Sequence, residues 1–117
     1  MGYHRNLAVW KLSQRLAEAV YRVTESFPRH EQFGLVAQMR RACSSISANI
    51  AEGTGKLGDR EMARFLRMAR GSASELDSHI DLARRLGYIT VEQEKPLLRA
   101  VLRIQRMLFG LIKTLTD

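Results

Sequence analysis

Apolar side chains recur at intervals of three and four residues along almost the whole chain, which is the period of an amphipathic α-helix. No segment alternates apolar and polar residues for long enough to predict a β-strand. Proline and glycine interrupt the helical pattern at Pro28, in the loop GTGKLG and at Gly87. We therefore expect four helices, over residues 7–27, 31–53, 59–86 and 91–116.

The start of the fourth helix has two interpretations. Thr90 and Gln93 have the spacing of a capping box, which would start the helix at residue 91. Pro96 stands one turn further on, where its ring and missing N–H disturb a helix. Either the helix kinks at Pro96 or it begins near Glu94. For the first helix, Asn6 is a suitable N-cap residue.

Each predicted helix carries one stripe of apolar residues on a single face. The stripes are Val9, Leu12, Leu16, Val20, Val23 and Phe27; Leu35, Met39, Ala42, Ile46, Ile50 and Gly53; Met62, Phe65, Ala69, Leu76, Ile80 and Ala83; and Leu97, Val101, Ile104, Leu108, Leu111 and Leu115. Four helices of about twenty residues joined by short connections favour an antiparallel arrangement. The sequence therefore predicts an all-α fold, an up-down-up-down four-helix bundle that forms one domain over residues 1–117.

The first and fourth helices carry more apolar surface than one core face requires. These additional positions are Trp10 and Tyr21 on the first helix, and Leu98, Leu102, Phe109 and Ile112 on the fourth. A wide core face would account for some of them. An exposed apolar seam of this size is typical of a partner surface. We therefore expect these residues to form the interface of a homo-oligomer.

The segment RRACSSISANIAEG of the second helix places small and polar residues on separate faces. One edge carries Gln38, Ser45, Asn49 and Glu52, and the third helix has a comparable edge with Ser72, Glu75 and His79. Two antiparallel helices would bring these edges together as a buried hydrogen-bonded seam. Ser44 lies instead on a face of small residues opposite the core stripe.

The same segment gives little support for catalysis. A serine nucleophile needs a neighbouring base, and none of the serines has a histidine at helical spacing. The loop GTGKLGD lacks the ending of a phosphate-binding loop and follows a helix rather than a strand. His79 alone has too few partners for a metal site. We expect no enzyme activity, no metal and no cofactor.

The chain is strongly basic, with 19 Lys and Arg against 12 Asp and Glu and a formal net charge of +7. Basic residues follow the outer faces of the third and fourth helices, and we expect them to bind nucleic acid: Arg60, Arg64, Arg67, Lys95, Arg99, Arg103, Arg106 and Lys113. Asp77 and Asp81 are the alternative partners, because they would neighbour Arg99 and Arg103 across the bundle. Aromatic residues are not interleaved with the arginines, so contacts to the RNA backbone are expected rather than base reading.

Two further features of the sequence concern the cellular compartment of the protein. The single cysteine, Cys43, excludes an internal disulfide and is typical of a reducing cytosol. The N-terminus lacks the apolar segment of a secretory signal, and no apolar run is long enough for a membrane span. We therefore expect a cytoplasmic protein without a membrane partner.

Three motifs together resemble a known family. They are FP-x-x-E-x-F-GL from Phe27 to Leu35, Q-x-RRA-x-x-SI-x-x-NIAEG from Gln38 to Gly53, and A-x-GS-x-x-E from Ala69 to Glu75. The chain resembles the four-helix-bundle proteins encoded in intervening sequences of bacterial 23S ribosomal RNA genes, over nearly its whole length. Gly58 departs from the Ser or Thr that usually caps the third helix in that family.

The resemblance implies a homopentamer. It also implies a relationship to the accessory protein of diversity-generating retroelements, which associates with a reverse transcriptase and with RNA. We therefore expect a non-enzymatic, homo-oligomeric protein that binds RNA or a nucleoprotein partner. The alternative is a protein-interaction scaffold, for example an accessory subunit for a reverse transcriptase, without direct RNA binding. A hydrolytic or metal-dependent enzyme ranks third.

Overall fold

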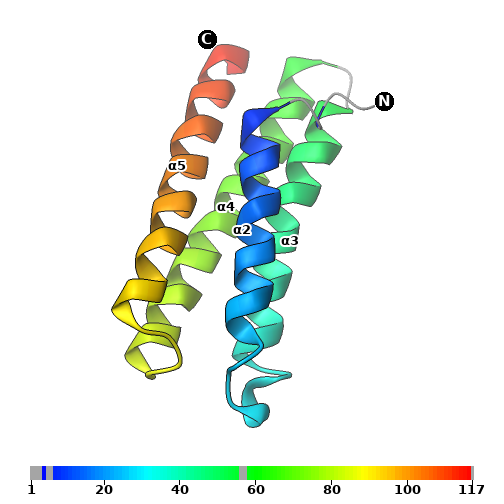
Figure 1. Ribbon diagram of the computed structural model, residues 1–117. Coiled ribbons are helices and arrows are strands. Elements are labelled where there is room, and N and C mark those ends of the chain that lie inside the picture. Colours follow the sequence, from blue (N-terminus) through cyan, green and yellow to red (C-terminus); the bar gives the residue numbers. More distant parts are fainter. Residues whose placement is uncertain (1–3, 5–6, 56–57, 117) are drawn as a thin grey trace.

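The computed structural model describes residue 4, residues 7–55 and residues 58–116. Its four long helices are α2 (Ala8–Thr24), α3 (Leu35–Thr54), α4 (Asp59–Arg85) and α5 (Val91–Thr116), and a short 3₁₀ helix, η1 (Arg29–Glu31), precedes α3. Consecutive helices run in opposite directions and lie side by side (Figure 1). The predicted up-down-up-down four-helix bundle is therefore confirmed for the described residues.

Each helix of the bundle packs against two neighbours. α2 contacts α3 and α5, and α4 contacts the same two helices. α2 and α4 thus occupy opposite corners, and the buried faces of all four helices meet in one core. Among the described helices, none is long and apolar enough to cross a membrane.

The connection between α2 and α3 differs from the prediction. α2 ends at Thr24 rather than at Phe27, and α3 begins at Leu35 rather than at residue 31. Phe27 nevertheless remains in the core, where its ring packs on the ring of Tyr88. The predicted cap Asn6 lies outside the described residues, as do residues 56 and 57 of the GTGKLG loop.

Glu31 explains where α3 begins. Its Oε1 accepts a hydrogen bond from the backbone N–H of Leu35, at 3.1 Å, which satisfies one of the free donors at the helix start. Its Oε2 accepts a second hydrogen bond from the hydroxyl of Tyr88, at 2.8 Å. These two donors hold the pKa of the Glu31 carboxyl below its usual value, because they stabilise the ionised form. The glutamate of the first sequence motif therefore ties the α2–α3 connection to the α4–α5 connection.

Two glycines at the ends of α4 have backbone conformations that other residues rarely adopt. Gly58 precedes the helix with a φ of +91°, so this position requires glycine more than it requires a capping side chain. Gly87 follows the helix with a φ of +80°. The Tyr88 N–H bonds to the Ala83 carbonyl, and the Gly87 N–H bonds to the Arg84 carbonyl, which is the Schellman pattern.

α5 begins at Val91 and contains Pro96 in its second turn. The Gln93 N–H donates to Thr90 Oγ1 at 3.1 Å, while the Thr90 N–H donates to Gln93 Oε1 at 2.8 Å. This reciprocal pair is the capping box, and it decides between the two interpretations in favour of the earlier start. The predicted range 91–116 is therefore the range observed.

The core contains most of the predicted stripes, although Leu12, Val23 and Leu115 are half-buried rather than buried. Ile112, predicted at the oligomer interface, is buried with 7% exposure and belongs to the core, while Leu111 is half-buried. Ala63, Leu66 and Ala73 of α4 are buried, whereas Met62 and Phe65 are half-buried. The hydroxyl-bearing residues Ser13, Thr24 and Ser47 are also buried. Ser13 of α2 and Ser47 of α3 share a hydrogen bond of 2.9 Å across the core.

Candidate nucleic-acid interface and neighbouring surfaces

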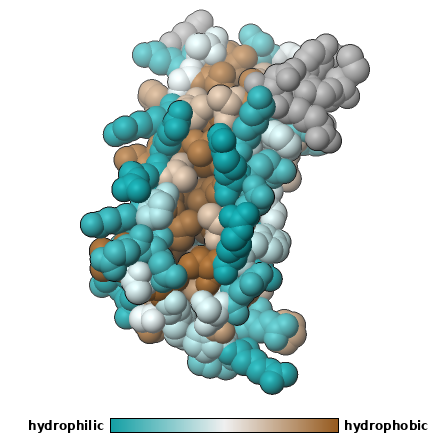
Figure 2. Space-filling model, viewed as in Figure 1, coloured by the Kyte–Doolittle hydropathy of each residue, from teal (hydrophilic) through white to brown (hydrophobic). Residues whose placement is uncertain are grey.

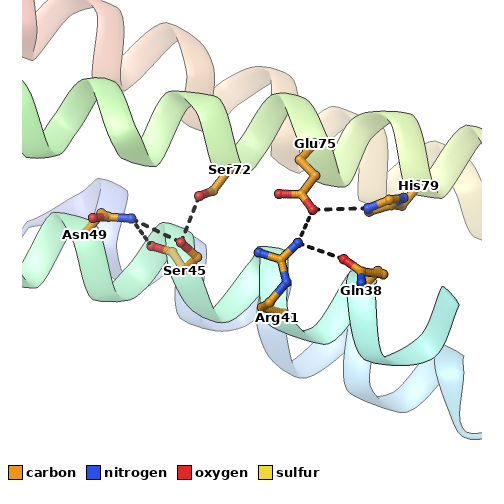
Figure 3. Close-up of polar contacts among 7 residues, drawn as sticks. All are labelled: Gln38, Arg41, Ser45, Asn49, Ser72, Glu75 and His79. Atoms are coloured by element: carbon orange, nitrogen blue, oxygen red, sulfur yellow. Dashed lines mark hydrogen bonds and ion pairs between the residues drawn. The ribbon is translucent and has the colours of Figure 1, made fainter. Parts of the chain in front are cut away.

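The predicted polar seam lies between α3 and α4 (Figure 3). The hydroxyls of Ser45 and Ser72 are 2.8 Å apart and share a hydrogen bond between the two helices. The Asn49 side chain donates to the carbonyl and to the hydroxyl of Ser45, at 2.9 and 3.1 Å. These three side chains are half-buried rather than fully buried. Glu52, which we had placed in the same seam, is exposed.

A second group continues the seam toward the start of α3. Arg41 donates to the Glu75 carboxylate and to the Gln38 amide oxygen, and His79 lies 3.3 Å from the same carboxylate (Figure 3). Glu75 therefore lies in this seam, where it is half-buried. Arg41 was missed, because its position on the outer side of α3 is typical of a solvated residue, and its length lets it reach α4.

The seam predicts a clear difference between two adjacent serines. Ser45→Ala removes the acceptor that serves Asn49 and the partner of Ser72, so it should lower the free energy of unfolding by about 1–2 kcal/mol. Ser44→Ala is the matched control, because Ser44 is exposed on the same helix, and its effect should stay within about 0.5 kcal/mol. Urea unfolding at one fixed protein concentration measures both. Equal effects would show that the hydroxyl of Ser45 contributes nothing specific.

The additional apolar residues do not form one seam. Tyr21 lies on the α3 side of α2, where the guanidinium of Arg40 stacks 4.5 Å from its ring centroid. Phe109 lies on the α4 side of α5, with the guanidinium of Arg70 at 5.4 Å. Because α2 and α4 do not touch, these two places are on opposite sides of the bundle. The residues predicted at the oligomer interface therefore lie on two separate surfaces of the bundle.

We call these places the α2–α3 surface and the α4–α5 surface. The first is defined by Trp10, which is half-buried, and Tyr21, which is 43% exposed. The second is defined by Leu98, which is half-buried, and by Phe109, which is 55% exposed. Leu102, which is 51% exposed, lines a hollow between α2 and α5 together with Leu12. Ile112 belongs to neither, since it is buried in the core.

Phe33 is an exposed aromatic residue that the predicted interface did not include. It lies between η1 and α3, and 89% of its surface is exposed. The sequence did mark this residue, since Phe33 is the aromatic position of the first motif. Apolar periodicity, however, carries no information about a residue that lies between helices.

All eight predicted nucleic-acid-binding residues are exposed on the outer faces of α4 and α5: Arg60, Arg64, Arg67, Lys95, Arg99, Arg103, Arg106 and Lys113. Arg64 is partly neutralised, because its Nε lies 3.1 Å from the Glu61 carboxylate. Within the described part of the chain, the other seven take part in no ion pair.

The acidic residues that were the alternative partners of Arg99 and Arg103 do not contact them. Asp81 binds Arg85 at 2.7 Å and Arg84 at 3.6 Å, both on its own helix. Arg84 in turn binds Glu94 of α5 at 3.1 Å. These ion pairs hold the pKa of Asp81 below its usual value, chiefly through the hydrogen bond from Arg85. Asp81 is thus occupied by arginines of its own helix, while Asp77 is exposed and takes part in no ion pair within the described ranges. The outer line of α5 therefore remains positively charged.

The serine, histidine and cysteine side chains that were considered for catalysis take part in the packing and hydrogen bonding of the bundle. Ser45 and Ser47 bond to other polar side chains of the bundle, and His79 bonds to Glu75. Cys43 is fully buried, and burial raises the pKa of its thiol to about 11, which keeps it protonated at neutral pH. In the described ranges no three His, Cys, Asp or Glu residues lie close enough together to hold a metal ion.

This chain is similar to known proteins in both sequence and structure. The family model described as 23S rRNA-intervening sequence protein matches residues 5–110. A crystal structure of a protein with unknown function from the S23 ribosomal protein family of Bacteroides thetaiotaomicron superposes with a TM-score of 0.82 at 26% identity. That match covers 91% of this chain and 99% of the other. No match is found among curated proteins.

Proposed function

Because this chain belongs to the family of 23S rRNA-intervening sequence proteins, we propose that it is a non-enzymatic homo-oligomer whose basic outer surface binds RNA. The observation that carries the proposal is the unneutralised line of Lys95, Arg99, Arg103, Arg106 and Lys113 along α5. Repeated in an oligomer, these charges give a continuous positive field that attracts a polyanion. The guanidinium groups of Arg99, Arg103 and Arg106 suit bidentate contacts with phosphates.

The oligomer part of the proposal is supported by the two apolar surfaces. A pair related by two-fold symmetry would use one patch twice, whereas two different patches on opposite sides suit head-to-tail contacts. Such contacts close into a ring when the rotation between neighbours permits it. The α2–α3 surface of one copy would then meet the α4–α5 surface of the next. The number of copies that we propose, five, comes from the family resemblance.

RNA binding is tested by its dependence on salt. For a single strand, log affinity falls linearly with log salt, and each neutralised phosphate adds about 0.7 to the slope. The triple variant Arg99→Gln, Arg103→Gln, Arg106→Gln should therefore lose about 2 from the slope and weaken binding to all sequences alike. Filter binding or anisotropy with short RNAs of different sequence measures both.

A matched control separates specific contacts from net charge. The triple variant Arg22→Gln, Arg41→Gln, Arg85→Gln removes the same number of charges, but each of these arginines is paired with a carboxylate and none belongs to the predicted RNA-binding set. This control variant should change the slope of log affinity against log salt much less than the variant of Arg99, Arg103 and Arg106. Undetectable RNA binding at about 150 mM salt, where exposed charges are screened beyond about 8 Å, would contradict the proposal. The alternative, a scaffold for a reverse transcriptase-like protein, would then replace it.

A further inference from the structure

An apolar groove runs between α2 and α5. Figure 2 shows it as a hydrophobic strip that descends between two columns of hydrophilic side chains. Two adjoining hollows form it, of about 470 and 450 Å³, and they share Arg106 as a lining residue. Its floor consists of half-buried aliphatic side chains that rest on the core: Leu7, Leu12, Ala100, Met107 and Leu111.

Positive charge lies on both sides of this groove. On the α5 side, Arg99, Arg103 and Arg106 line it. On the α2 side, Lys11 and Arg15 are exposed within one turn of Leu12. None of the described residues that line the groove is acidic. An apolar floor between two basic margins is complementary to a ligand that is apolar on one face and acidic along its edges.

We propose that this groove binds an amphipathic α-helix of a partner protein, with aliphatic residues on one face and Glu or Asp beside them. The lined part of α5 extends from Arg99 to Thr114, which corresponds to about 22 Å of helix. A partner helix of about 15 residues therefore fills it. Helix-in-groove recognition uses such spacing, with apolar anchors at every third or fourth position. This inference goes beyond RNA binding and does not depend on it.

Two other occupants suit the groove less well. Single-stranded RNA binds to basic grooves through bases stacked on aromatic rings, and the described lining residues include no aromatic side chain. A second copy that docked through its α4 or α5 face would bring like charge to the margins, because those faces carry residues such as Arg60, Arg67 and Lys95. An acidic amphipathic helix is complementary to both the floor and the margins.

The experiment uses a labelled helical peptide of about 15 residues with Leu on one face and Glu along both edges. Its control peptide has Lys in place of every Glu and the same apolar face. We expect the acidic peptide to bind the whole protein in fluorescence anisotropy at about 150 mM salt, and the basic peptide to bind at least about tenfold more weakly. Leu12→Glu and, separately, Arg103→Glu should each weaken the acidic peptide at least about tenfold.

Val91→Glu is the matched control variant, because Val91 is an exposed apolar residue that does not line the groove, and it should bind the acidic peptide normally. Arg103 is exposed, so its variant tests the groove even when Leu12→Glu disturbs folding. Equal binding of the two peptides, or no binding of either, overturns the inference. So does a Leu12→Glu variant that loses RNA instead of peptide, or one that dissociates the oligomer, since the groove would then serve RNA or another copy. Loss of the RNA salt dependence with intact peptide binding would reject the proposed function alone.

Discussion

Phe109→Glu should reduce the assembled protein to single chains of 13.3 kDa while leaving its helix content almost unchanged. Phe109 is 55% exposed on the α4–α5 surface, so a carboxylate there is tolerated in the free chain. In an assembly the same carboxylate would be desolvated against apolar surface, which is strongly unfavourable. Tyr21→Glu on the α2–α3 surface should have the same effect. Native mass spectrometry measures the assembly, and far-ultraviolet circular dichroism measures the helix content.

Mixing the two variants tests whether the contacts are head-to-tail. Phe109→Glu keeps its α2–α3 surface, and Tyr21→Glu keeps its α4–α5 surface, so one contact can still form between them. The mixture should therefore give a dimer of twice the chain mass that grows no further. Leu86→Glu is the control, because Leu86 is 50% exposed but belongs to neither surface, and it should assemble normally. A wild-type protein that is monomeric at micromolar concentration would refute the oligomer proposal.

Gly53→Leu should lower the free energy of unfolding by about 2–4 kcal/mol. Gly53 is the last residue of the NIAEG sequence and is buried. Of the glycines in the helices, it is the one whose backbone lies closest to a neighbouring helix, α4. A Cβ atom there would lie 3.0 Å from the Cβ of Phe65 and 3.3 Å from the carbonyl oxygen of Met62. Because backbone atoms of α4 form part of this contact, relief would require the two helices to separate.

The same substitution at Gly71 provides the control. Gly71 is exposed within α4, and a Cβ atom there would meet nothing within 4 Å. Since leucine favours a helix more than glycine does, Gly71→Leu should raise the free energy of unfolding by up to about 1 kcal/mol. Urea unfolding at equal protein concentrations compares the two variants. Similar effects at both positions would mean that helix propensity, and not the close approach of α3 and α4, governs Gly53.

The helices themselves could be predicted from sequence. The period of apolar residues located four helices, and α5 has the predicted bounds because the capping box of Thr90 and Gln93 acts within one turn. The polar edge of α3 was also predictable, since residues 45 and 49 lie on one side of any α-helix. Such features depend on interactions between residues close in the chain, and these interactions are the same in any context.

What only the tertiary structure decided was which neighbour each helix face meets. Periodicity gives the angle of a side chain around the axis of its own helix, but it does not give the positions of the other helices. Ile112 and Phe109 are both apolar and three residues apart, yet the first is buried in the core and the second is exposed beside Arg70. Likewise, Tyr21 and Phe109 belong to opposite sides of the bundle only because α3 and α5 separate α2 from α4.

For charge pairing and for the α2–α5 groove, too, the sequence determined one part and the tertiary structure decided the rest. The sequence determined that arginines outnumber their acidic partners on the outer faces, since counting and periodicity are enough for that. Which arginines are neutralised depended on reach across the bundle: Arg84 binds Glu94 of α5, while Arg99 and Arg103 lie along the groove. A groove exists only between two packed helices, so no single segment of sequence contains it.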